Sequence, residues 1–556
     1  MRASHAPSAK RIGSSRNADV ANPTDAAVRT TRFHRLAPWW HRTFGIDLRS
    51  LAALRIALGA MVAVDGAFRA VDLTAHYTDA GTYPLDALKL NWDGSYWWMA
   101  TLYAYDTGPT LPGILLALQF LAGVLLALGW QARFAAFLAW FLIVQVQNRN
   151  PIILHGGDQM LRIVAFWAMF LPVGARWSID GAVGKLRAYG QPVAETTVSV
   201  GSFALLFQCA ITYWSTAALK TGVEWGLEGS ALWYALGIQQ YETTIGIWIR
   251  SWPTILLRLM TWGTIGLEWA APLAILAVPR PAVRSTIVLG MFAFHLLLIT
   301  PMMDVGPISW ESCLWWIPFL PGSFWDFGAK FAAPWVDRIG WTRLSKAVSQ
   351  WRTARDKKWV AERKPFPRID PSFPMQVAAA LAIAWVVYWN AMGILDKPAR
   401  FSTVNRVFRL DQHWAMFAPR PMKEDGWYIA AARLADGSIV DLFQGGKPAT
   451  LAKPDYIPAL YRNTRWAKHW MNLWMVRYAE YRRFMTAWMR TEWDRKNPDR
   501  KVVGMTLWFQ LQLTPPPGEP RKPPEPIALW SEAAMGVPAP PIRLDGMPPE
   551  SLQGKK

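Results

Sequence analysis

The chain has 556 residues, 52% of which are hydrophobic, and it carries a formal net charge of +20. That apolar fraction is typical of a protein whose surface faces lipid, and the 35 tryptophans agree because Trp favours the membrane–water interface. Since the charge accompanies no nucleic-acid-binding motif and Cys209 and Cys313 are the only cysteines, neither a nucleic-acid partner nor a metal site is expected.

Residues 1–45 are predicted to form a basic N-terminal arm and an interfacial segment. This stretch has neither the short apolar core nor the small-residue cleavage site of a signal peptide. It ends in the run APWWHRTFG, whose tryptophans are typical of a membrane–water interface.

We predict a mainly α-helical fold, a polytopic membrane helix bundle with a small extracytoplasmic α+β region. A helix that crosses a bilayer needs about 20 mostly apolar residues. The transmembrane domain is predicted to cover 46–325, and 374–395 is predicted to be the last transmembrane helix. The nine predicted spans are 50–71, 110–130, 132–148, 158–175, 200–220, 255–278, 283–301, 305–320 and 374–395.

Charge alternates between the loops that join these spans. The loops 72–109 and 221–254 are acidic, whereas the loops 176–199 and 326–373 are basic. The positive-inside rule then places the N-terminal arm and the loop 326–373 in the cytoplasm. The region after the ninth span is outside, which is the periplasm for a bacterial inner membrane and the lumen for a eukaryotic one.

Residues 396–514 are predicted to form the extracytoplasmic α+β region. Two strand-like runs flank Asp436-Gly437, which is a strong hairpin signal. The segment 455–497 is predicted to be helical, and 502–514 is predicted to be a further strand. The tail 515–556 is rich in proline, which predicts an extended or disordered chain.

Ionisable residues inside predicted spans are costly and therefore mark candidate functional groups. Glu268 lies mid-span in IGLEWAAPL, where a carboxyl needs a proton or a cation such as Lys220 at the outer end of the fifth span. His295 is either a functional group or a neutral histidine bonded to a neighbouring helix. We predict Lys220, Glu268 and His295 as catalytic residues. In the first span, Arg55 and Arg69 are expected to snorkel to the headgroups.

The stretch NPIILHGGDQMLRI at 150–163 gathers polar groups where the fourth span begins. Its glycines permit a turn that exposes backbone amides at a helix start, and such a start favours anions. Asp158 has a structural alternative, which is to cap the helix and pair with Arg162. His155 is either a base or a hydrogen-bonding loop residue. We predict that His155, Asp158 and Arg162 bind a ligand at the outer mouth of a buried polar pocket.

Several longer stretches follow one another in a characteristic order. They are ALRIALGAMVAVD, YTDAGTYPLDAL, HGGDQMLRIVAFWAMFLPVGARWSIDG, QCAITYWSTAALKTGVEWGLEGSALWYAL and FHLLLITPMMDVGPISWESCLWWIPFLP. In this order they resemble the horizontally transferred transmembrane (HTTM) domain family, whose best-known member is the vitamin K-dependent gamma-carboxylase. The resemblance covers roughly 40–325. The later stretches LDQHWAMFAPRP and EDGWYIAAARLADGSIVDL look like the extracytoplasmic region of bacterial members.

The resemblance implies a membrane domain whose pocket opens to the extracytoplasmic side. In the carboxylase this pocket binds a reduced quinone, which a lysine deprotonates before a glutamate side chain is carboxylated. The run WSIDG at 177–181 matches the family, Lys220 and Trp225 match its K-x-x-x-x-W spacing, and His295 matches its F-H pair. Trp225 therefore joins the predicted ligand-binding residues. The corresponding segment for the catalytic lysine, 148–151, contains none.

Two classes of function follow from these observations. The first is a membrane enzyme that acts on a quinone or another lipid-like molecule and modifies an extracytoplasmic protein or peptide partner. The second is a non-catalytic membrane scaffold whose region 396–556 docks a partner, and the missing lysine favours it. Transport is the weaker hypothesis because the sequence has no repeated halves.

Overall fold

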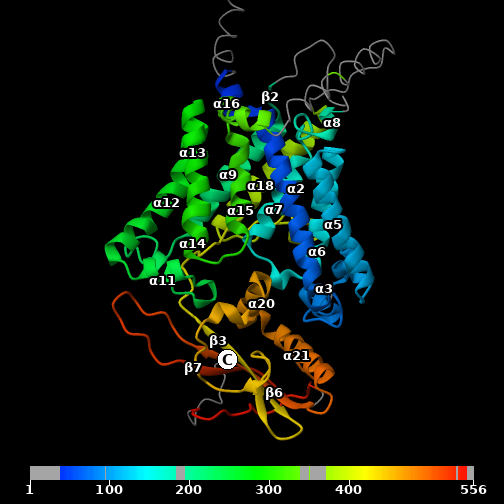
Figure 1. The fold of residues 1–556 in the computed structure, drawn as a ribbon, viewed down its shortest axis with the longest axis vertical. Helices are drawn as coiled ribbons and strands as arrows, with labels where there is room; N and C mark the ends of the chain where they lie inside the picture. Colours follow the sequence, from blue (N-terminus) through cyan, green and yellow to red (C-terminus); the bar gives the residue numbers. More distant parts are fainter. Residues whose placement is uncertain are drawn as a thin grey trace, which may run out of the picture.

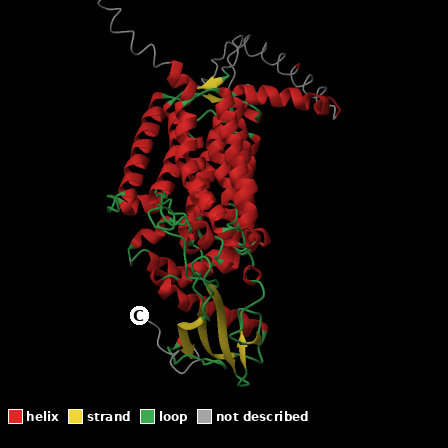
Figure 2. Ribbon diagram, turned by 90° about the vertical axis from the view of Figure 1, so that its left-hand side faces the viewer, coloured by secondary structure: helices red, strands yellow, loops and turns green. Residues whose placement is uncertain are grey.

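The computed structural model describes residues 38–93, 95–182, 195–338, 350, 371–533 and 536–547. Over these residues the chain is mainly helical, as predicted. A helical bundle occupies most of the molecule, and a small sheet with helices beside it lies at one end (Figures 1 and 2). Most of the predicted N-terminal arm and of the predicted basic loop lies outside the described residues.

Six helical segments are long and apolar enough to cross a membrane, and each coincides with a predicted span. The last but one, Pro281–Met302, joins three elements without a break. The six are α2 (Leu48–Val71), α5 (Thr110–Leu128), α9 (Val200–Leu219), α12 (Thr254–Ala277), the run α13 (Pro281–Ala293), η5 (Phe294–Ile299, a π-helical turn) and α14 (Thr300–Met302), and α18 (Phe373–Ile394).

The other three predicted spans are also helices of the bundle, but their length and composition do not single them out as spans. α7 (Gly156–Ala168) has 13 residues and α15 (Ile308–Trp316) has 9, against the about 20 that a bilayer requires. α6 (Ala132–Arg149) ends in a buried polar run, 145–149, that is interrupted only by Val146. The count of nine spans therefore stays a prediction.

Small residues set the closest helix contact of the bundle. A Cβ atom on Gly59 of α2 would lie 2.4 Å from the backbone nitrogen of Ala127, and one on Gly123 of α5 would lie 2.5 Å from that of Ala63. Only glycine permits this approach, which is the usual device for packing apolar helices closely. By contrast, the outer helices α12, α13 and α18 expose large apolar side chains, among them Leu259, Leu289 and Leu381.

The C-terminal region is built on an antiparallel five-stranded sheet with the order β5-β4-β3-β6-β7. Gly437 has a φ of +83° in the turn between β3 and β4, which confirms the predicted hairpin. β7 extends the sheet beyond residue 514 into the proline-rich tail. The elements are β3 (Gly426–Leu434), β4 (Ile439–Asp441), β5 (Lys447–Pro448), α20 (Thr464–Trp474), α21 (Arg482–Lys496), β6 (Val502–Leu511) and β7 (Glu525–Ala533).

Short elements lie at the two ends of the bundle (Figure 1). The end away from the sheet holds β1 (Ile46–Asp47), which pairs with β2 (Thr196–Thr197), as well as α8 (Ile179–Ala182) and α16 (Gly322–Arg338). The end next to the sheet includes α3 (Leu73–Tyr77) and α11 (Thr244–Arg250), and other connections contain α4 (Leu85–Asn91), α10 (Ala231–Ala235) and α19 (Ser402–Phe408).

Candidate functional site

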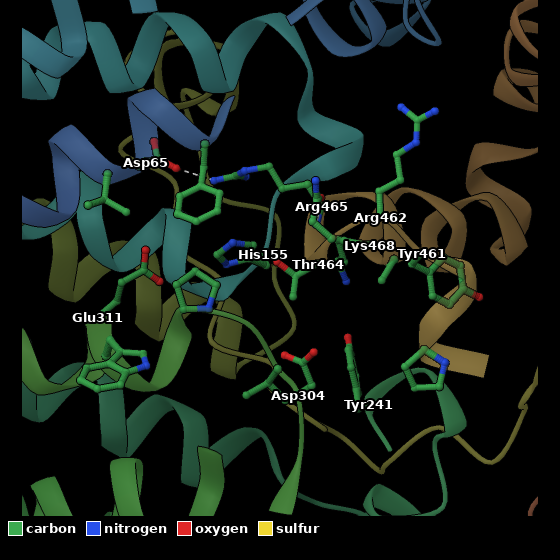
Figure 3. Close-up of a pocket in the computed structure, with 18 of the residues that line it drawn as sticks. Asp65, His155, Tyr241, Asp304, Glu311, Tyr461, Arg462, Thr464, Arg465 and Lys468 are labelled. Carbon is green, nitrogen blue, oxygen red and sulfur yellow. Dashed lines mark hydrogen bonds and ion pairs between the residues drawn. The ribbon is translucent and has the colours of Figure 1, made fainter. Parts of the chain in front are cut away.

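A cavity of about 610 Å³ lies where the bundle meets the C-terminal region (Figure 3). Its walls come from α2, the start of α7, the segment 304–311 and α20, together with Gln240 and Tyr241 of η4 (Gln239–Tyr241). These segments are far apart in the sequence. The cavity therefore exists only because the C-terminal region is seated on the end of the bundle.

One wall of the cavity is apolar and belongs to the outer surface of the bundle. It is formed by Ala60, Met61, Val64 and Phe68 of α2 and by Trp310 of α15. Val64, Phe68 and Trp310 are 53%, 64% and 54% exposed, so the same side chains that line the cavity also face the outside of a membrane-length helix. Exposed apolar side chains of α2 and α15 thus line this part of the cavity.

Next to this wall lies a buried network of two arginines and two aspartates, of which Asp65 and Arg465 line the cavity. Arg69 donates to Asp65 at 2.7 Å and to Asp158 at 2.5 Å. Arg465 of α20 donates to Asp65 at 2.5 Å and reaches both carboxylate oxygens of Asp158, at 3.1 and 3.2 Å. Two positive and two negative charges cancel, which is what allows the network to be buried. The network joins α2, α7 and α20 through ion pairs.

The start of α7 places His155 at the cavity. His155 is the N-cap residue, and its backbone N–H donates to Asp158 at 2.9 Å. Its ring Nδ1 accepts the N–H of Gly157 at 3.1 Å, so a neutral ring holds its proton on Nε2. Nε2 lies 3.4 Å from Asp158 but makes no hydrogen bond to any described residue. His155 therefore presents an unused N–H donor.

Glu311 of α15 is the second buried group at this point, and Gly157 makes room for it. A Cβ atom at position 157 would lie 1.5 Å from Oε2 of Glu311 and 3.0 Å from Cε1 of His155. Glu311 is 5% exposed, and Oε2 has no hydrogen-bond partner among the described residues. Because buried polar atoms are nearly always paired, the unused atoms of His155 and Glu311 single out this end of the cavity.

The C-terminal region supplies the remaining wall, which contains Lys468. The Lys468 ammonium lies 3.8 Å from the Met471 sulfur and has no carboxylate within salt-bridge distance in the described part of the chain. Burial, reinforced by the nearby cation Arg477, lowers the pKa of Lys468 to about 8. A buried amine with this pKa can either hold an anion or accept a proton near neutral pH.

The structure separates the residues that the sequence predicted as one site. His155 lines the cavity, whereas Asp158 pairs with Arg69 and Arg465, and not with Arg162 as the structural alternative proposed. Asp158 does cap α7, from the third position of the helix. Arg162 instead donates to the backbone oxygens of Arg409 and Asp411 and to Gln147, so it holds the segment after α19 against the bundle.

Lys220, Glu268 and His295 do not line this cavity. Lys220 donates to both carboxylate oxygens of Glu268 at 2.6 and 2.7 Å, and its ammonium lies 4.9 Å from the ring centre of Trp225. The partner that Glu268 requires is thus the one that the sequence suggested. Their catalytic role stays a prediction.

His295 and Trp225 have partners of their own. His295 lies in the π-helical turn η5 and bonds the Tyr213 hydroxyl at 2.7 Å, while Trp225 donates to the backbone oxygen of Phe417 at 2.9 Å. The bond between His295 and a residue of α9 matches the alternative of a histidine bonded to a neighbouring helix.

The expectation that Arg55 and Arg69 snorkel to headgroups is wrong. Both side chains are buried inside the bundle, at 0% and 1% exposure. Arg69 belongs to the ion-pair network, and Arg55 donates to the backbone oxygen of Trp177 at the end away from the sheet. There Asp180, from the WSIDG run, accepts the backbone N–H groups of Gln131 and Ala132 at the start of α6. This run thus has a structural role far from the cavity.

Sequence reasoning missed Glu311, Arg465 and Lys468. A signal for Glu311 was available, because it is an ionisable residue within the predicted span 305–320. No such signal marks Arg465 and Lys468, which lie on an ordinary amphipathic helix of the C-terminal region.

No protein-family model, curated protein or solved structure matches this chain. The resemblance to the HTTM family therefore stays a prediction. Among the described residues, no cluster of three or more His, Cys, Asp or Glu side chains is placed to hold a metal ion.

Proposed function

We propose that this chain is an integral membrane protein that binds an amphiphilic, lipid-like molecule in the cavity and transfers protons at the polar end of that molecule. The observation that carries the proposal is the combination of two features in one cavity. Exposed apolar side chains of α2 and α15 line the same cavity as His155 and Glu311, each of which has a buried polar atom without a hydrogen-bond partner among the described residues.

The shape of the cavity favours an amphiphile over a soluble ligand. Ligand sites are usually mostly apolar with a few convergent polar groups, and a volume of about 610 Å³ lies within their usual range. Here the apolar groups include exposed side chains, such as Phe68 of the membrane-length helix α2 and Trp310 of α15. A molecule that leaves the bilayer sideways would keep its tail against this wall and place its head between His155 and Glu311.

The two polar groups suit proton transfer to and from an oxygen atom. Nε2 of His155 is a donor, and Oε2 of Glu311 has no hydrogen-bond partner among the described residues, so Glu311 is an acceptor when it is ionised. A ligand hydroxyl between them would give its proton to Glu311 while the His155 N–H stabilises the oxygen that is left. Such positioned acid–base groups typically accelerate proton transfer by about 10²–10⁴-fold.

The proposed membrane arrangement has nine crossings. Contacts at the two ends of the shorter helices support it: Asp180 binds the start of α6 and Arg409 binds Asn148 near its end, while Arg465 binds the start of α7. An odd number of crossings puts the N-terminal arm and the C-terminal region on opposite sides. With the positive-inside rule, we place the C-terminal region in the periplasm of a bacterial inner membrane.

The family resemblance, taken with this geometry, suggests a reduced quinone as the amphiphile. A reduced quinone has an apolar ring and tail and a hydroxyl whose proton an acid–base pair can take. Carboxylation is not part of the proposal, because the segment 148–151 lacks the family's lysine and its Arg149 is bound to the Tyr83 backbone oxygen.

A non-catalytic scaffold is the second candidate. It is favoured by the Arg465 network, which fixes the C-terminal region to the bundle and would hold its outer surface in place for an extracytoplasmic protein or peptide. A scaffold does not need the unpaired atoms of His155 and Glu311, which is why we rank it second.

The test is the lipid content of the purified chain. The wild type, extracted in mild detergent, is expected to retain an amphiphile that mass spectrometry of a solvent extract identifies. Substitution Ala60→Trp fills the cavity from α2 and should abolish retention. Ala67→Trp, on an exposed position of the same helix that does not line the cavity, is the matched control and should retain it.

The proton-transfer part is tested separately with Glu311→Gln and His155→Ala. Both variants should still retain the amphiphile but should lose proton transfer at its polar end. Glu480→Gln, which changes an exposed carboxylate elsewhere, should keep both retention and proton transfer. Equal retention in the Ala60→Trp and wild-type proteins would overturn the binding proposal. Unchanged turnover in both polar variants would leave the scaffold as the better account.

A further inference from the structure

The basic side chains that line the cavity differ in whether they have a carboxylate partner. Asp65 and Arg465 neutralise each other within the buried network, and Arg462 lies 3.6 Å from Asp72. Of the three basic side chains that line the cavity, Lys468 alone has no carboxylate within salt-bridge distance among the described residues.

Lys468 is half-buried at the wall of the cavity. Its ammonium lies 3.8 Å from the Met471 sulfur, which also accepts the Tyr241 hydroxyl at 3.3 Å. Thr464 lies one turn earlier on α20 and also lines the cavity (Figure 3). An ammonium in such a place is normally paired, and none of the described residues places a carboxylate within salt-bridge distance of it.

The position of Lys468 fits the head of an amphiphile. His155 and Glu311 lie on the bundle side of the cavity, and Lys468 and Thr464 lie on the side of the C-terminal region (Figure 3). A molecule whose tail rests against Phe68 and Trp310 would have its head between these two sets of groups.

Resting on the proposed function, we propose that Lys468 and Thr464 form an anion subsite for a phosphate ester at the head of the bound amphiphile. The ammonium would supply the charge, and the Thr464 hydroxyl would supply a hydrogen bond. Charge-assisted hydrogen bonds of this kind are stronger than neutral ones and add discrimination between charged and neutral heads.

The test compares three probes by native mass spectrometry of the full chain in detergent. They are dioleoyl-phosphatidylglycerol, dioleoylglycerol, which has the same tails without the phosphate, and soluble glycerol phosphate. The wild type should prefer the phospholipid to dioleoylglycerol by about tenfold or more, as one charge-assisted bond predicts. Substitution Lys468→Met should remove the preference, and Lys468→Arg should keep most of it.

The variants are expected to fold, because the substitution of Lys468 strands no carboxylate partner. Lys501→Met, an exposed lysine of the same region, is the matched control. Binding of glycerol phosphate that depends on Lys468 would support the subsite and assign it to a soluble ester. An equal affinity of the wild type for both lipids, or a preference that survives Lys468→Met, would overturn the subsite. Failure of Ala60→Trp to reduce dioleoylglycerol binding would instead overturn the proposed function.

Discussion

Arg465 of α20 and Asp65 of α2 form a buried ion pair although 400 positions separate them in the sequence. Arg465 also binds Asp158 at the start of α7, so one side chain of the C-terminal region contacts two helices of the bundle. This contact holds the C-terminal region where it closes the cavity. The site is therefore shared between the two parts of the chain.

Substitution Arg465→Met should destabilise the junction strongly. It would leave Asp65 and Asp158, both buried, with Arg69 as their remaining cation, and breaking a buried pair from one side costs about 3–5 kcal/mol. We expect a lower melting temperature in detergent and faster proteolysis of the C-terminal region. Arg462→Met is the control, because Arg462 is mostly exposed and 3.6 Å from Asp72. An Arg465→Met protein as stable as that control would show that the network does not hold the junction.

Gly157→Ala should disturb the site with the smallest possible change. The added Cβ would lie 1.5 Å from Oε2 of Glu311, so either the carboxyl or the start of α7 must move. We expect lost turnover and weaker amphiphile retention. Gly263→Ala is the matched control, because nothing lies within 4 Å of its Cβ position, and alanine there should stabilise α12 by about 0.5–1 kcal/mol. Normal turnover of Gly157→Ala would argue against Glu311 as the proton acceptor.

A double-mutant cycle at Lys220 and Glu268 tests whether this pair is structural or catalytic. Each single substitution, Lys220→Met or Glu268→Gln, leaves the other group without its partner at 2.6–2.7 Å and should lower the unfolding temperature. The double variant should recover most of the loss, and amphiphile turnover should recover with it. Recovered stability without turnover would instead support the catalytic role that the sequence predicts for this pair.

The affinity for phosphatidylglycerol should fall as pH rises through about 8. Burial lowers the pKa of Lys468 to about 8, so the ammonium that binds the anion is present below this pH and is lost above it. The charged or titratable groups near it are Arg477, Arg465, Asp304 and Tyr241.

Binding measured from pH 6.5 to 9.5 should show this decline in the wild type and in Lys501→Met. Dioleoylglycerol, which has no charge, should bind equally across the range, and Lys468→Met should show no decline for either lipid. A wild-type affinity for phosphatidylglycerol that does not change over this range would contradict the role of the ammonium.

Hydropathy predicted the long apolar helices and was weaker for the short ones. The six membrane-length helices, including α12 and α18, have long apolar runs that composition alone identifies. α7 and α15 are short, and most of their residues are buried against protein, so their sequences need not be uniformly apolar. The hairpin at Asp436-Gly437 was predictable because its turn chemistry is local.

The candidate site was only partly predictable because it depends on tertiary contacts. The polar stretch that begins at His155 correctly indicated one edge of the cavity. Its partners were not predictable, since Arg465 and Asp65 meet only after the C-terminal region docks. Lys220 and Glu268 were predicted to be functional because each is an ionisable group in an apolar segment. In the structure each is the ion-pair partner of the other.

An experimental structure of the chain purified from its own membrane would test the central claim most directly. The account predicts density for an elongated molecule whose tail lies against Phe68 and Trp310 and whose head lies between His155, Glu311 and Lys468. A cavity filled only by water, or closed by its own side chains in protein that retains no lipid, would contradict it.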